Sequence, residues 1–294
     1  MRPTANKLKL GIPKGSLQDS TIKLFAKSGW KINLHHRNYF PEINDPEIAC
    51  SLCRAQEMPV YVQDGTLDVG LTGKDWILEN EAEVVTVDEL VYSKMSNRPA
   101  RWVLAVGGDS PYKRPEDLAG KKIATELENF TRRYFQQADI PVDVEFSWGA
   151  TEAKVVSGLA DAIVEVTETG TTIRAHGLRI IAELLTTSTQ LIANTKAWEN
   201  PWKQSKITQM RTLLQGALRA ESLVGLKMNV HQDNLDELMR ILPSLTSPTV
   251  SNLYQADWLS IEIVVQEATV RDIIPQLQSI GVEGIIEYPL YKVI

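Results

Sequence analysis

The segment DAIVEVTETGTTI, residues 161–173, has the residue types that a phosphate-binding turn requires. An apolar strand carrying two acids runs into a turn rich in Thr and Gly. Such a turn presents backbone N–H groups and hydroxyls at one point, which suits a phosphate monoester, and an acid before it can accept hydrogen bonds from sugar hydroxyls. The candidate ligands are Asp161, Glu165, Glu168, Thr169, Gly170, Thr171 and Thr172. Because Thr and Gly clusters are also common in ordinary turns, spacing alone leaves both interpretations open.

Basic residues end two predicted strands in the amino-terminal part of the chain. Lys14, Gly15 and Ser16 form a strand-to-helix turn, where an ammonium and backbone amides can meet an anion. Arg54 ends the strand CSLCRA and offers a planar fork of donors to a phosphate. The structural alternatives are a plain helix cap with a solvated lysine and a surface arginine.

Acids and glycines also frame a third predicted strand, LDVGLTG. Asp64 lies in the turn before this strand, Asp68 is its second residue, and Gly73 is its last residue. Asp64 followed by glycine also has the composition of a simple turn. The chain contains no G-x-S-x-G, H-E-x-x-H or Walker motif, so neither a nucleophile elbow nor a P-loop is predicted. Cys50 and Cys53 form a single C-x-x-C pair without ligand-spaced histidines, and we expect reduced strand cysteines.

The elements that would position these residues alternate between strand and helix. Strands are predicted at 7–12, 48–54, 67–73, 101–106, 121–125, 161–166 and 179–185, with helical or turn segments between them. The first helix stops at Gly29, a typical position after a helix end. Such alternation favours an α/β fold with mainly parallel sheets covered by helices.

The order of elements changes after about residue 217. Strand, helix, two strands, helix and strand follow one another, which is the βαββαβ order of a ferredoxin-like domain. The order is complete in about 75 residues, so a separate carboxyl-terminal domain is predicted. A polar and aromatic stretch, NTKAWENPWKQSK, precedes a helix predicted from Ile207 that would connect the two parts.

Length and composition restrict the class of protein. A chain of 294 residues is long for one domain and suggests two or three units. Its net charge of −6 and the lack of a clustered basic stretch argue against nucleic acid as a partner. No signal peptide and no run of about 18 apolar residues is visible, so we expect no membrane partner and a cytoplasmic location.

The segment 161–173 resembles the phosphoribosyl pyrophosphate loop of the ATP phosphoribosyltransferases. The matching positions are Asp161, Glu165, Thr169, Gly170, Thr172, Gly177 and Leu178. The opening GIPKGSL and the central VQDGTLDVGLTGKD occur in the family's order and spacing, and the tail resembles the regulatory domain of the long form. The resemblance covers essentially the whole chain. One position departs from the pattern: Glu165 stands where the family commonly has Asp.

The resemblance implies a reaction in which an adenine ring nitrogen of ATP displaces pyrophosphate from phosphoribosyl pyrophosphate with inversion, the first step of histidine biosynthesis. Magnesium would accompany the pyrophosphate. The same resemblance places Lys14, Gly15, Ser16, Arg54, Asp64, Asp68 and Gly73 on the ATP or pyrophosphate side. Histidine would act as an inhibitor at the segment SPTVSNL, where Thr249 and Ser251 are the candidates. A homohexamer in equilibrium with a dimer is implied as well.

The implied architecture is a pair of α/β lobes like those of periplasmic binding proteins, with a central cleft. Residues 1–105 with 186–216 would form the first lobe, 106–185 the second, and 217–294 the ferredoxin-like domain. Two other functions stay open, because a fold is shared by proteins of different activity. One is a non-enzymatic two-lobe ligand-binding protein, and the other is a phosphoribosyltransferase that acts on another base.

Overall fold

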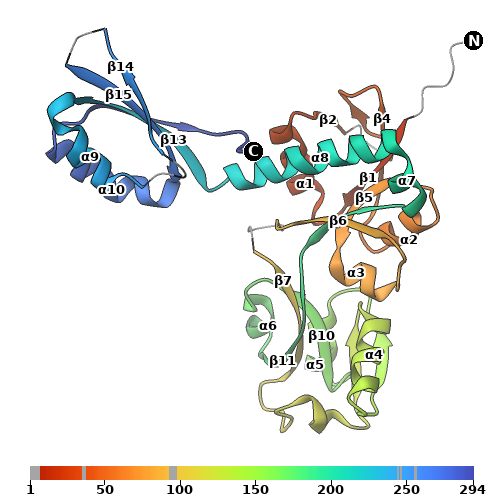
Figure 1. Cartoon of the computed structure of the whole chain (residues 1–294). Coiled ribbons are helices and arrows are strands. Elements are labelled where there is room, and N and C mark those ends of the chain that lie inside the picture. The colour runs from red at the N-terminus through yellow and green to blue at the C-terminus, as the bar shows by residue number, and fades with distance from the viewer. Residues whose placement is uncertain (1–6, 35–37, 93–97, 244, 246, 255–256) are drawn as a thin grey trace, which may run out of the picture. The chain divides into compact units, whose positions relative to one another are not determined.

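The computed structural model describes residues 7–294 apart from 35–37, 93–97, 244, 246 and 255–256. The chain divides into two compact units, Met1–Ala26 with Trp30–Arg211, and Lys27–Gly29 with Thr212–Ile294. Within the described residues, the first unit contains two five-stranded sheets and a two-stranded ribbon, and the second unit contains one four-stranded sheet (Figure 1).

The first sheet has the strand order β4-β1-β5-β12-β6. Four strands run in one direction, β4 (Ile48–Arg54), β1 (Leu8–Lys14), β5 (Val69–Gly73) and β6 (Val85–Leu90), and β12 (Thr189–Ala193), between β5 and β6, runs opposite to them. Every residue of β5 and β12 is buried, as expected of central strands covered on both faces. The associated helices are α1 (Gln18–Ser28), α2 (Met58–Gln63), α3 (Lys74–Glu79) and α7 (Thr195–Glu199), and the ribbon is β2 (Ile32–Asn33) with β3 (Glu42–Ile43).

The second sheet repeats this plan, with the order β11-β7-β10-β8-β9. Here β10 (Ala162–Thr167), β8 (Lys122–Thr125), β9 (Asp143–Phe146) and β11 (Leu178–Thr187) run in one direction, and β7 (Ala100–Gly107), between β10 and β11, runs opposite to them. A 3₁₀ turn (Pro115–Leu118) and three helices accompany them, α4 (Glu128–Gln137), α5 (Thr151–Val156) and α6 (Thr171–Ala175). Each lobe therefore contains three parallel strands joined by helices, β1, β4 and β5 in the first lobe and β8, β9 and β10 in the second.

The expected lobe boundary at residue 105 falls inside β7. The whole of β7 pairs with β10 and β11, so the chain has already entered the second lobe before Ala100. It returns through Ser188, since β11 ends at Thr187 and β12 begins at Thr189 in the first sheet. In each sheet four of the five strands run in one direction, in agreement with the mainly parallel sheets that were predicted.

The helix α8 (Pro201–Ala220) begins six residues before the predicted Ile207. Proline is favoured in the first turn of a helix, where its missing N–H is not needed. The Asn200 side chain accepts hydrogen bonds from the backbone N–H groups of Trp202 and Lys203, each at 3.1 Å, and so caps the helix. Part of the stretch expected to be irregular is therefore helical.

The four-stranded sheet of the second unit has the order β14-β15-β13-β16 with all pairs antiparallel. Its elements are β13 (Leu223–His231), a 3₁₀ turn (Gln232–Asn234), α9 (Leu235–Ile241), β14 (Thr249–Asn252), β15 (Trp258–Gln266), α10 (Glu267–Ser279) and β16 (Glu283–Pro289). Alternate residues of β13 and β15 pack in one apolar core with both helices, which leaves the opposite face of the sheet for polar residues.

The predicted fold class is confirmed: two α/β lobes of the periplasmic-binding-protein type are followed by a ferredoxin-like domain. No helix in the described part of the chain combines the length and the apolar character needed to cross a membrane.

Candidate functional site

Two cations end adjacent parallel strands of the first lobe. Lys14 is the last residue of β1, Arg54 is the last residue of β4, and the two are partners in the strand register. Neighbouring strands lie about 4.8 Å apart, so both side chains leave the sheet at one point of its carboxyl edge. The Lys14 ammonium lies 4.2 Å from the centre of the Tyr39 ring. This edge can therefore receive an anionic group.

The turn after β1 also has the predicted form. Gly15 has a φ of 110°, a left-handed conformation that favours glycine, and its carbonyl accepts the N–H of Gln18 at 3.1 Å. Ser16 lies in this turn, ahead of α1. The structure thus brings Lys14, Gly15, Ser16 and Arg54 to the same edge of the first sheet.

The Thr and Gly turn lies at the carboxyl end of β10 in the second lobe. Gly170 has a φ of 75°, and its N–H donates to the Thr167 hydroxyl at 2.8 Å. The hydroxyls of Thr169 and Thr171 lie 2.8 Å apart, and Thr171 begins α6. Glu168 is half-buried in this turn and Thr172 is exposed. The turn is therefore folded into a compact shape by its own side chains.

Arg174 adds a positive charge to this turn. Its guanidinium donates to the Thr169 carbonyl at 3.1 Å, and a Cβ on Gly170 would lie 2.8 Å from its Nη1. Arg174 was not among the residues expected from the sequence. Its position four residues after Gly170, where a helical segment returns to the same face, is a signal that would have pointed to it.

Glu165 lies on β10 directly before the turn. Burial raises the pKa of its carboxyl to about 7, and the nearby charges of Glu152 and Glu126 act in the same direction, while a hydrogen bond with Thr151 opposes the shift. Its Oε1 accepts the N–H of Val166 at 3.2 Å. A carboxyl with this pKa changes its charge near neutral pH and can accept or donate a hydrogen bond there.

One contact joins the carboxyl edges of the two sheets. Glu126 follows β8 in the second lobe and forms a hydrogen bond with Gln56 of the first lobe, and the charge of Arg54 is close enough to favour its ionised form. Burial is the larger effect and raises the pKa of Glu126. Glu126 was not expected from the sequence, since nothing in its local pattern marks it. The two lobes therefore approach each other at Glu126 and Gln56.

Asp161 and Asp68 lie at the amino ends of their strands, where each carboxylate binds a backbone amide of a neighbouring strand. The Asp161 carboxylate accepts the N–H of Lys122 at 3.0 Å, at the amino end of β10. A strand of six residues spans roughly 20 Å, so this carboxylate is remote from the turn after Thr167. Asp68 accepts the N–H of Lys9 at 2.9 Å at the amino end of β5. Both carboxylates join neighbouring strands.

Asp64 also binds a backbone amide. Its carboxylate accepts the N–H of Thr66 at 2.7 Å in an exposed turn that ends α2, and Gly65 has a φ of 79°. This backbone hydrogen bond lowers the pKa of Asp64. The turn leads into the amino end of β5, away from Lys14 and Arg54. The simple turn that the sequence allowed is the observed one.

Gly73 ends β5 at the predicted edge, but a side chain explains why glycine is needed there. A Cβ on Gly73 would lie 1.9 Å from Oδ1 of Asp75, whose carboxylate folds back over the start of α3. The close packing of Asp75, rather than a ligand, therefore restricts this position.

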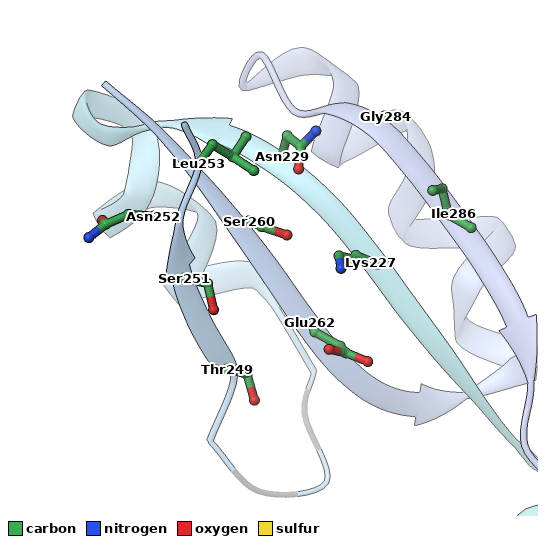
Figure 2. A pocket seen from close by; sticks show the side chains of 10 residues that line it. All are labelled: Lys227, Asn229, Thr249, Ser251, Asn252, Leu253, Ser260, Glu262, Gly284 and Ile286. Carbon is green, nitrogen blue, oxygen red and sulfur yellow. The ribbon is translucent and has the colours of Figure 1, made fainter. Parts of the chain in front are cut away.

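A pocket of about 420 Å³ lies on the polar face of the sheet in the second unit (Figure 2). Thr249 and Ser251 project into it from β14, and they pair with Glu262 and Ser260 of β15. Lys227, on β13, is the register partner of Glu262. The pocket is lined by Lys227, Asn229, Thr249, Ser251, Asn252, Leu253, Ser260, Glu262, Gly284 and Ile286. The two predicted hydroxyl residues are thus joined by one positive and one negative side chain.

Among the residues that the structure describes, no group of three or more His, Cys, Asp or Glu side chains could hold a metal ion. Cys50 and Cys53 are free, as expected.

Two α/β lobes whose edges carry cations and a phosphate-type turn, followed by a ferredoxin-like domain, define a two-lobe α/β protein with an added carboxyl-terminal module. Comparison with known proteins identifies the family. Residues 54–216 match the model of the ATP phosphoribosyltransferase family, and residues 220–292 match the model described as HisG, C-terminal domain. The chain belongs to the ATP phosphoribosyltransferase family and has the form that includes this carboxyl-terminal domain.

Individual relatives agree with this membership. An ATP phosphoribosyltransferase of Solidesulfovibrio magneticus is 75% identical over 98% of this chain and 99% of its own length. One from Nitratidesulfovibrio vulgaris is 70% identical over the same shares. A solved structure, described as the ATP phosphoribosyl transferase (HisG:HisZ) complex from Thermotoga maritima, is similar with a TM-score of 0.60 at 29% identity, over 71% of this chain and 96% of that chain.

Proposed function

We propose that the chain transfers the phosphoribosyl group of phosphoribosyl pyrophosphate to the adenine ring of ATP, giving phosphoribosyl-ATP and pyrophosphate, the first step of histidine biosynthesis. The single observation that carries the proposal is the full-length identity of 75% to a relative of this name. The enzyme is then a pentosyl transferase of the glycosyltransferase class.

The turn after β10 is proposed to hold the 5-phosphate of the sugar. The hydroxyls of Thr169 and Thr171 and the first-turn amides of α6 can donate to its oxygens, and the Arg174 guanidinium supplies charge. Glu165 would accept a hydrogen bond from a ribose hydroxyl when ionised. Its burial beside the turn supports this role, and the additional methylene relative to Asp lengthens its reach.

Lys14 and Arg54 are proposed to neutralise the phosphates of ATP or the departing pyrophosphate. A ring nitrogen attacks the anomeric carbon as the bond to pyrophosphate breaks, so charge develops mainly on the leaving group. Such a loose displacement needs alignment and charge neutralisation more than a strong base. Mg²⁺ would arrive with the diphosphate of the substrate, where it neutralises phosphate charge.

The decisive experiment mixes purified protein with ATP, phosphoribosyl pyrophosphate and Mg²⁺ and follows pyrophosphate and phosphoribosyl-ATP. We expect both products, and no comparable reaction with GTP, CTP or UTP. Binding of both substrates without product would favour the non-enzymatic two-lobe protein. Equal use of other nucleotides would favour a phosphoribosyltransferase of another specificity.

The pocket of the second unit is proposed to bind histidine as an inhibitor. The pair Lys227 and Glu262 offers one charge of each sign, which matches the carboxylate and the amino group of a free amino acid, and Thr249 and Ser251 add hydroxyls. Adding millimolar histidine to the same assay should lower the rate. Activity indifferent to histidine at this concentration would contradict the regulatory role.

The proposed assembly is a homohexamer in equilibrium with a dimer, in a cytoplasmic enzyme whose partners are its substrates and histidine. Light scattering of the purified protein across a range of concentrations tests this point. A monomer at every concentration would contradict it.

A further inference from the structure

The helix α3 follows β5 in the first lobe, but both of its ends bind the second lobe. It lies next to α4 in Figure 1. Its first turn carries Asp75 and its last residue is Glu79. Glu79 lies outside the motifs that carry the family resemblance, and the reaction outlined above uses neither residue.

At its amino end, α3 is attached to the two strands by which the chain enters and leaves the second lobe. Asp75 is buried, and its Oδ2 accepts the indole N–H of Trp102 in β7 at 2.7 Å. Its backbone N–H donates to the hydroxyl of Thr187, the last residue of β11, at 3.2 Å. The Trp76 ring packs edge-on against the Trp102 ring, with centroids 6.1 Å apart. These contacts join β5, β7 and β11 at the crossing point.

At its carboxyl end, α3 supplies the cap that α4 lacks. The residue before α4 is Leu127, which has no side-chain acceptor, so the first amides of α4 have no local cap. Glu79 provides it from 50 residues away: Oε1 accepts the N–H of Asn129 and Oε2 accepts the N–H of Phe130, each at 2.8 Å. A carboxylate is well placed there, because the helix dipole and charge-assisted hydrogen bonds both favour it.

The backbone amides that donate to Glu79 lie close in the sheet topology to the proposed sugar-phosphate turn. Only Glu126 and Leu127 separate β8 from α4, and β8 is the parallel neighbour of β10, whose carboxyl end carries the sugar-phosphate turn. Glu126 of this same short connection contacts Gln56 of the first lobe. A shift of the α4 start would therefore move the second lobe's edge relative to Arg54 and Lys14.

We propose that Glu79 is a positioning residue for phosphoribosyl transfer, which makes α3 a brace that sets how the two lobes face each other. The inference rests on the proposed function, in which the sugar phosphate is held by the second lobe and the nucleotide by the first. Alignment of the two substrates then depends on Glu79, whereas the contacts of each substrate with its own lobe do not. Displacement of reacting groups by about 1 Å can lower a rate by about 100-fold.

The test compares kcat and KM for Glu79→Ala, Glu79→Gln and a matched control. Glu81→Gln is the control, because Glu81 also joins α3's end to α4, through an exposed ion pair with Arg133 at 3.4 Å, but caps no helix. We expect kcat to fall at least tenfold in Glu79→Ala and less in Glu79→Gln, which keeps one acceptor. The KM of both substrates should change less than threefold, and Glu81→Gln should match the wild type within twofold.

Two readouts separate a positioning role from a merely structural one. A lower melting temperature with unchanged kcat would overturn the inference and leave Glu79 as a stabilising cap. A raised KM for phosphoribosyl pyrophosphate with unchanged kcat would also overturn it, since the effect would then lie within one lobe. An inactive wild-type protein would contradict the proposed function and this inference together, whereas an active wild type with equally active Glu79→Ala contradicts the inference alone.

Discussion

Asp68 and Asp161 occupy the same place in the two lobes. Each lies three residues after a glycine with a positive φ, Gly65 and Gly158, and each carboxylate accepts a backbone N–H at the start of the neighbouring parallel strand, that of Lys9 in β1 and that of Lys122 in β8. The repeated G-x-x-D pattern therefore lies at the amino ends of β5 and β10. There its aspartate joins two neighbouring strands, at the end of each strand that is remote from the proposed site.

Replacing Asp161 by Ala should destabilise the fold without affecting substrate binding. The Lys122 amide loses its carboxylate acceptor, and an unpaired buried donor costs about 1–3 kcal/mol. Urea unfolding measures this loss, and steady-state kinetics at a temperature where the variant is folded should give a KM for phosphoribosyl pyrophosphate within twofold of the wild type. A KM raised tenfold or more would return Asp161 to the binding site.

Replacing Gly170 by Ala should weaken phosphoribosyl pyrophosphate binding about tenfold or more. The new methyl group requires a left-handed alanine and meets the Arg174 guanidinium at 2.8 Å, so the turn and its cation must both move. Thr169→Ala should weaken binding as well, by the loss of one hydroxyl. Isothermal titration with phosphoribosyl pyrophosphate measures both effects.

Gly158→Ala is the matched control for the turn variant. Gly158 has a φ of 71°, no atom lies within 4 Å of its added Cβ, and it precedes the opposite end of the same strand. It should cost about 1–2 kcal/mol of stability through backbone strain and leave ligand binding unchanged. Equal loss of binding in both variants would mean that strain in the second lobe, rather than the turn itself, affects the ligand.

The raised pKa of Glu165 predicts a pH dependence of stability. The folded state holds the proton with a pKa of about 7, above the ordinary 4.5, so this group favours folding at low pH and its contribution is lost as pH rises from 4.5 through 7. At 1.36 kcal/mol for each unit, the loss is at most about 3 kcal/mol.

Glu165→Gln removes this titration. Its free energy of unfolding, measured in urea, should change less than that of the wild type between pH 5 and pH 8. Parallel curves for the two proteins would show that Glu165 titrates at its ordinary pKa in the folded state.

Replacing Thr249 by Val or Ser251 by Ala should raise the half-inhibitory concentration of histidine several-fold. Each change removes one hydroxyl from the pocket at nearly constant volume. Inhibition is measured relative to each variant's own uninhibited rate. Thr269→Val is the control, because the Thr269 hydroxyl donates to the Gln266 carbonyl at the start of α10, outside the pocket. Unchanged inhibition in both pocket variants would place histidine elsewhere.

The local sequence was enough to predict most helices and strands and the turns at the proposed site. The βαββαβ order of the tail and the turns at Gly15 and Gly170 are visible because strand period, apolar spacing and glycine are properties of neighbouring residues. The start of α8 was missed because its cap, Asn200, lies within a stretch whose composition also suits a loop. The boundary within β7 was missed because sheet membership depends on pairing partners that are distant in the chain.

The sequence by itself determined the family, the two α/β lobes with their ferredoxin-like domain, and the residues of the phosphate-type turn. Only the tertiary structure decided which acids lie beside that turn. Asp161 and Glu165 are four residues apart, one directly before β10 and one within it, yet Asp161 binds the Lys122 amide and desolvation raises the pKa of Glu165 to about 7. The cap that Glu79 places on α4 was likewise invisible, since a hydrogen bond between residues 50 positions apart exists only after the lobes have folded against each other.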